Sequence, residues 1–94
     1  MTLAEFKAAD PETLKDPLRA LWWDGQGDWD RAHEIAQDIE DAEGSWIHAY
    51  LHRKEGDTGN AGYWYRRAGR RPAAGSLETE WGEIVETLLA QPSV

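Results

Sequence analysis

The chain has 94 residues and a net charge of −8, a length that supports one domain with a modest core and excludes a second independent domain. Because the chain contains no cysteine, disulfides and thiolate chemistry are excluded. No apolar run approaches the roughly 20 residues that span a bilayer, and the first residues lack the apolar core of a signal peptide, so we expect a cytoplasmic protein that contacts no membrane.

Helix signals recur along the chain, and no segment alternates between apolar and polar residues as a strand would. Apolar residues spaced three and four apart, together with capping residues and glycines, predict six short helices at approximately residues 2–9, 16–24, 28–44, 45–55, 57–69 and 76–90. The connections are short, which makes neighbouring helices antiparallel. We therefore predict an all-α fold, a compact bundle of five to six short antiparallel helices.

Polar residues that cap helices mark where four of these helices should begin. Thr2 and Glu5 have the spacing of a capping box, and Asp16 precedes a proline as an N-cap residue would. Ser45 and Ser76 each precede a segment with helical periodicity, so they are better explained as helix caps than as catalytic nucleophiles.

A short motif occurs twice, at an offset of 29 positions. Residues 27–32 and 56–61 both begin with glycine and aspartate and have an alanine four residues after the aspartate. The glycine suits a left-handed turn and the aspartate caps the next helix, which predicts a repeated helix hairpin. Residues 56–69 resemble the second helix of tetratricopeptide-type helix-hairpin repeats, and this resemblance covers roughly residues 17–71. It implies hairpin architecture and binding to other proteins.

Residues 46–57 and 63–67 also resemble the signature of a small family of bacterial proteins, a resemblance that brings no activity with it. The whole chain, residues 1–94, is predicted to be a single helical domain. Within it, residues 1–15 are a candidate peripheral N-terminal helix, residues 17–71 form two hairpins and residues 76–90 form the C-terminal helix.

Charge is distributed unevenly along this tryptophan-rich chain. Residues 1–45 hold 4 basic and 12 acidic residues, residues 46–71 hold 6 and 2, and residues 72–94 hold 0 and 4. The overall excess of negative charge repels a phosphate backbone, so we expect no binding to nucleic acids. The basic middle segment has two explanations: its arginines bind an anionic partner, or basic helices pack beside acidic ones and form surface ion pairs.

Two histidines in this segment are spaced for joint action. His48 and His52 are four residues apart, so on a helix their imidazoles project from the same face and are compatible with one divalent metal ion. Two ligands do not make a site, and a third would have to come from Glu55, Asp57 or His33. We therefore predict no metal site and no cofactor, with one histidine packed between aromatic rings and the other solvated.

The next predicted helix contains three adjacent aromatic residues, 63–65, followed by Arg66 and Arg67. Because successive helical residues turn by about 100 degrees, the three rings cannot all point in one direction. This leaves at least one ring at the surface, beside guanidinium groups that bind carboxylate or phosphate bidentately. The alternative is that all three rings pack into the core and the arginines extend over it.

We predict no catalytic or ligand-binding role for the carboxylates of the third and sixth predicted helices. We expect the following to lie on solvated outer faces: Glu34, Asp38, Asp41, Glu78, Glu80 and Glu83. A solvated acidic face is the usual fate of such residues on an amphipathic helix.

These observations favour a protein-interaction or anionic-ligand-binding module, whose partner is an acidic peptide, a protein or a small anion. The candidate ligand-binding residues are Trp46, His48, His52, Arg53, Asn60, Tyr63, Arg66 and Arg67. The alternative is a small enzyme that uses His48 or His52 as a general base or metal ligand, and the sequence alone does not decide whether a reaction is catalysed. A third candidate is a homodimer that buries aromatic surface across a two-fold interface.

Overall fold

The computed structural model describes residues 1–91. In this range the chain forms six α-helices, one 3₁₀ turn and no strand, which confirms the predicted all-α fold. The elements are α1 (Leu3–Ala8), η1 (Pro11–Thr13), α2 (Asp16–Gly25), α3 (Trp29–Gln37), α4 (Ala42–Lys54), α5 (Thr58–Ala68) and α6 (Leu77–Leu89). None of the described helices is long and apolar enough to cross a membrane.

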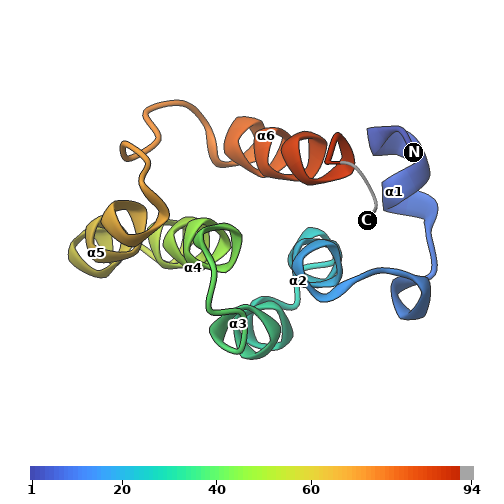
Figure 1. The fold of residues 1–94 in the computed structure, drawn as a ribbon, viewed down its shortest axis with the longest axis horizontal. Helices are drawn as coiled ribbons and strands as arrows, with labels where there is room; N and C mark the ends of the chain where they lie inside the picture. Colours follow the sequence, from blue (N-terminus) through green and yellow to red (C-terminus); the bar gives the residue numbers. More distant parts are fainter. Residues whose placement is uncertain (92–94) are drawn as a thin grey trace.

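Helix α4 is the central element of the bundle. It contacts α2, α3, α5 and α6, while α1 contacts α2 and α6 at the opposite end of the molecule from α5 (Figure 1). Every residue of α4 from Gly44 to His52 is buried. A helix buried all round must satisfy its polar side chains inside the protein, and this requirement positions the histidines considered below.

The repeated glycine–aspartate motif forms the same turn twice. Gly27 and Gly56 have φ angles of 87° and 89°, a left-handed conformation that glycine adopts without steric cost. The aspartate that follows each glycine caps the next helix with its side chain, at Asp28 for α3 and at Asp57 for α5. The backbone N–H of each aspartate also donates to a carbonyl of the preceding helix, at 3.0 and 2.9 Å. Helices α3 and α5 therefore begin with the same turn and the same type of cap.

The boundary between α3 and α4 differs from the prediction. Helix α3 ends at Gln37 instead of near Gly44, and α4 begins at Ala42 with Asp41 as its N-cap. The Asp41 carboxylate accepts a hydrogen bond from the Gly44 N–H at 2.9 Å. Because aspartate and serine are both good caps, spacing alone could not choose between them, and Ser45 lies buried in the first turn of α4.

Of the three other predicted helix caps, two are present in the structure and one is displaced by one residue. Thr2 and Glu5 form the predicted capping box, and Ser76 caps α6 through the Thr79 N–H. The prediction for Asp16 was wrong by one position, since Lys15 is the N-cap and Asp16 is already helical. There its carboxylate pairs with Arg19 at 2.6 Å, in the first turn where the helix dipole favours negative charge.

Candidate functional site: the histidine cluster and the arginine face

Three histidines from two helices meet between α3 and α4. His48 and His52 share one face of α4, as their spacing predicted, and His33 on α3 lies opposite them. The Nε2 atoms of His33 and His48 are 2.8 Å apart. One ligand nitrogen from each of the three rings lies within 4.8 Å of the others. We call these three residues the histidine cluster.

Two tryptophans enclose the histidine cluster. The Trp29 ring stacks on His33 with centroids 4.9 Å apart and an interplanar angle of 9°, and its indole N–H is anchored to the carbonyl oxygen of Leu51 at 2.8 Å. Trp64 on α5 stacks on His48 with centroids 4.0 Å apart. These contacts leave His48 only 7% exposed, so the cluster is largely removed from bulk water.

His52 has a partner on each side of its ring. Its Nδ1 lies 2.6 Å from a carboxylate oxygen of Glu55, and its Nε2 lies 3.4 Å from the side-chain nitrogen of Asn60. Because a carboxylate only accepts, Nδ1 carries the proton, and in the neutral ring Nε2 then presents its lone pair. The Glu55 contact thus fixes both the tautomer and the direction of the free lone pair.

Burial lowers the pKa of two imidazoles of the cluster, those of His33 and His48. Desolvation lowers the pKa of His48 to about 4, and the positive charges that His33 and His52 would carry add to this effect. Desolvation, followed by the neighbouring His52, also lowers the pKa of His33. At neutral pH His48 is therefore uncharged. The expectation that one of the two α4 histidines would be solvated is wrong, because His52 is also 7% exposed.

The metal-free protein is expected to lose stability as the pH falls from about 6.5 to about 4. Between these pH values His48 is protonated in the unfolded state but neutral in the folded state. Above and below this range, His48 has the same charge in both states. The contribution of His48 is on the order of 3 kcal/mol. Urea titrations in the presence of a chelator measure it, and His48→Gln should show a smaller loss over the same interval. An equal loss in both proteins would contradict the assignment.

The exposed side of α5 carries cationic and aromatic groups. Tyr63 is 45% exposed, and its hydroxyl accepts a hydrogen bond from Arg67 at 3.2 Å. The Arg67 guanidinium also lies 5.9 Å from the ring centre of Tyr63 and 5.2 Å from that of Trp64. Trp64 therefore contacts both the histidine cluster and an exposed arginine.

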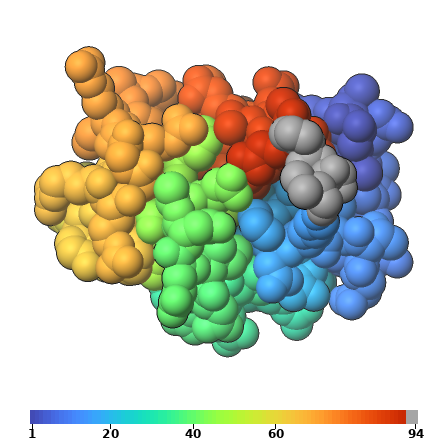
Figure 2. Space-filling model, in the orientation of Figure 1, coloured from blue at the N-terminus to red at the C-terminus, as the bar shows by residue number. Residues whose placement is uncertain are grey.

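Four arginines of this region have no acidic partner among residues 1–91. The carboxylate ion pairs of arginine in this range belong to Arg19, Arg31 and Arg53, and residues 58–77 contain no aspartate or glutamate. In Figure 2 this segment, in yellow and orange, forms one end of the molecule. We call the following exposed residues the arginine face: Tyr63, Arg66, Arg67, Arg70 and Arg71.

The structure places the eight predicted ligand-binding residues in three different surroundings. His48, His52 and Asn60 meet around the histidine cluster, while Tyr63, Arg66 and Arg67 lie on the arginine face next to it. Trp46 and Arg53 point elsewhere, toward Glu80 of α6: the Trp46 indole N–H donates to its carboxylate at 3.3 Å, and the Arg53 guanidinium does so at 3.0 Å. These two residues hold α6 in place and do not face the histidines.

Glu80 corrects the prediction that the acids of α6 are solvated. It is 2% exposed, and besides the Trp46 and Arg53 contacts it accepts a 2.6 Å hydrogen bond from the hydroxyl of Tyr65. Burial, with this bond, raises the pKa of that hydroxyl. Glu80 therefore joins α4, α5 and α6 through one buried carboxylate.

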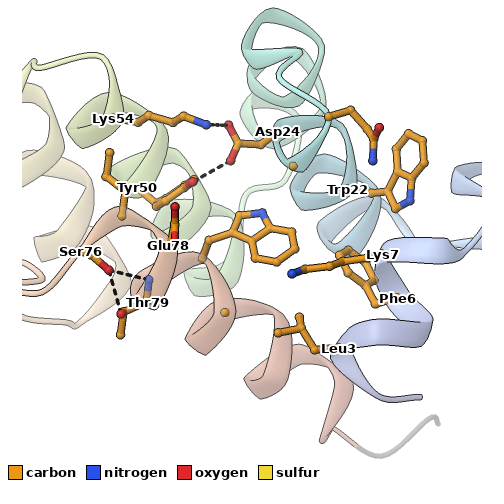
Figure 3. Close-up of a pocket in the computed structure, with 15 residues that line it drawn as sticks. Leu3, Phe6, Lys7, Trp22, Asp24, Tyr50, Lys54, Ser76, Glu78 and Thr79 are labelled. Atoms are coloured by element: carbon orange, nitrogen blue, oxygen red, sulfur yellow. Dashed lines mark hydrogen bonds and ion pairs between the residues drawn. The ribbon is translucent and has the colours of Figure 1, made fainter.

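A cavity of about 780 Å³ lies between α1, α2, α4 and α6 and is lined by none of the residues of the histidine cluster or the arginine face (Figure 3). Among its lining residues, Ser76 was predicted as a cap and Glu78 as a solvated acid, and none was predicted to bind a ligand. Its buried acid, Asp24, already accepts from Tyr50 at 2.7 Å and from Lys54 at 2.9 Å. The buried carboxylate of this cavity is thus engaged inside the protein.

Comparisons of the chain with protein-family models, with curated proteins and with solved structures gave no match. The resemblances to tetratricopeptide-type repeats and to the small bacterial family therefore stay predictions. The features of the molecule that bear on function are the histidine cluster and the arginine face.

Proposed function

We propose that this protein is a binding module whose arginine face docks an acidic segment of a partner protein. One observation carries the proposal: Arg66, Arg67, Arg70 and Arg71 have no carboxylate partner among residues 1–91, although the chain as a whole carries a charge of −8. Internal ion pairing explains Arg53, which binds Glu80. It does not explain these four.

The side chains of the face suit a carboxylate-rich partner. A guanidinium group presents a planar fork that holds a carboxylate with two parallel hydrogen bonds. Arg67 is held against the rings of Tyr63 and Trp64, so it loses less conformational entropy on binding than a free side chain would. Arginine and tyrosine are also the residue types that contribute most to protein interfaces.

The two other candidate functions have less support. An enzyme that uses His48 or His52 as a base needs substrate access, but both rings are buried and neither lines the large cavity. The predicted dimer would bury aromatic surface, but the exposed ring of Tyr63 lies among the arginines, so a two-fold contact there would bring like charges together, which is unfavourable. An acidic partner avoids both difficulties.

Removal of two unpaired arginines should weaken binding of an acidic probe. We expect Arg66→Ala/Arg67→Ala to reduce the affinity for a fluorescein-labelled deca-glutamate peptide by about ten- to a hundredfold, because two charge-assisted contacts are lost. Fluorescence anisotropy at low and moderate salt measures the effect, and added salt should weaken binding to the unmodified chain.

The matched control is Arg19→Ala/Arg31→Ala, which changes the net charge equally but removes arginines already paired with Asp16 and Asp28. This variant should bind the peptide about as well as the unmodified chain. Equal weakening in both double variants would mean that only net charge matters, and the proposal would fail. If inorganic phosphate displaces the peptide at comparable concentrations, the ligand of the arginine face is a small anion, and the proposal of an acidic protein segment fails.

A further inference from the structure

We propose that His33, His48 and His52 together bind one divalent transition-metal ion of the zinc type. The inference rests on the convergence of three imidazole nitrogens from α3 and α4 within 4.8 Å of one another. It departs from the sequence-based prediction of no metal site, and it does not depend on the function proposed for the arginine face.

The spacing of the cluster matches what such an ion requires. With Zn–N bonds of about 2.0–2.1 Å in a tetrahedral site, the nitrogens of two ligands lie about 3.3 Å apart. The observed His33–His48 distance of 2.8 Å lies just below this value, and the 4.8 Å limit for the trio lies above it. Small side-chain rotations therefore suffice. Imidazole is a preferred ligand of zinc, copper and nickel.

The surroundings of His52 also suit a metal ligand. Histidines that bind metals usually donate their second ring N–H to a carboxylate, which fixes the tautomer and raises ligand basicity. Glu55 takes this position at 2.6 Å from Nδ1, so Nε2 is the nitrogen of His52 that would bind the ion, in exchange for its 3.4 Å contact with the side-chain nitrogen of Asn60. Neutral imidazole is the form that coordinates.

Three protein ligands leave a fourth tetrahedral position for water or for another ligand. The enclosing rings of Trp29 and Trp64 restrict access to it, since Trp29 stacks on His33 and Trp64 on His48. Both indoles lie close enough to the proposed ion to report its binding through their fluorescence.

A second group of possible ligands provides a sharp internal comparison. His52, Glu55 and Asp57 also offer ligand atoms within 4.8 Å of one another, but Glu55 and Asp57 are exposed. His52 belongs to both groups, whereas His33 belongs only to the histidine cluster and Asp57 only to the second group. Substitution of each of these two residues therefore tells the groups apart.

The experiment uses the full chain, treated with a chelator and dialysed, and titrated with Zn²⁺ by calorimetry. We expect one ion per chain, and Co²⁺ in its place should give the absorption of a tetrahedral complex. His33→Gln should weaken Zn²⁺ binding at least about a hundredfold, and Glu55→Gln about tenfold, because outer-shell partners alone contribute 10- to 100-fold. Asp57→Asn, which retains a capping side chain, should bind Zn²⁺ as the unmodified chain does.

Several results would overturn the proposal. If Zn²⁺ binding is weakened in Asp57→Asn but not in His33→Gln, the ion binds to the second group. If the chain shows no saturable Zn²⁺ binding, or if His33→Gln binds Zn²⁺ as the unmodified chain does, the proposal is wrong.

His33 is the least buried of the three histidines, and circular dichroism checks that its variant is folded. If it is not, the Co²⁺ spectrum of the unmodified chain decides, since a spectrum without imidazole ligands refutes the site. Arg66→Ala, which keeps the Arg67 guanidinium beside Trp64, should leave Zn²⁺ affinity unchanged, so the two proposals fail separately.

Discussion

Replacement of Glu80 with alanine is expected to destabilise the protein by about 3–5 kcal/mol, because removal of one partner from a buried ion pair leaves the other uncompensated. Glu80 is 2% exposed and accepts hydrogen bonds from Tyr65, Trp46 and Arg53. Tyr65 and Trp46 would lose this acceptor inside the protein, and Arg53 would keep only the carbonyl oxygen of Gly75. For a domain of this size the loss is a large part of the total stability, which is typically about 5–15 kcal/mol.

Urea denaturation followed by circular dichroism measures this change. Glu83→Ala is the matched control, since Glu83 lies on the same helix and is exposed, and its removal should change stability by no more than about 0.5 kcal/mol. Similar losses in the two variants would show that the Glu80 network adds nothing beyond a surface carboxylate. Glu80→Gln keeps the shape and one acceptor, so it should fall between the two.

Gly44→Ala should destabilise the protein by about 3 kcal/mol, although alanine is the better helix former. A Cβ atom at Gly44 would overlap the carbonyl oxygen of Ile39 and lie 2.6 Å from the Ile39 Cβ. The backbone between α3 and α4 has to move before this atom fits. The glycine is thus required by the close approach of the α3–α4 connection to the first turn of α4.

Gly82→Ala is the control for this prediction. Gly82 lies within α6, and an added Cβ meets no atom within 4 Å. There the helix propensity of alanine acts alone, and we expect a gain of about 0.5–1 kcal/mol. Thermal and urea denaturation of both variants give the comparison, and a stabilised Gly44→Ala protein would refute the packing argument.

Local signals in the sequence predicted the fold well. The capping box at Thr2, the cap at Ser76 and the two glycine–aspartate turns involve residues close in sequence, and all four are present. The boundary at Asp41 was missed because two good capping residues stand within one turn of each other, and only the packing of the α3–α4 connection separates them.

The candidate site depended on contacts that spacing does not encode. His48 and His52 were placed on one face correctly, but His33 is 15 positions away from His48 and meets it only because α3 packs on α4. Glu80 offered a signal that was overlooked: it falls three residues after Leu77 and four before Ile84, which is the apolar side of α6. The charge of Glu80 predicted that it is exposed to solvent. Its partners Tyr65 and Arg53, which make burial possible, belong to other helices and could not be predicted from the sequence of α6.

The indole of Trp64 has a consequence for both proposals together. One side chain touches the His48 ring and lies beside the Arg67 guanidinium, so a change at either neighbour alters the environment of the other. If an ion and an acidic partner both bind, their equilibria are thermodynamically linked through this residue. Any strengthening of one by the other must then be matched by an equal strengthening in return.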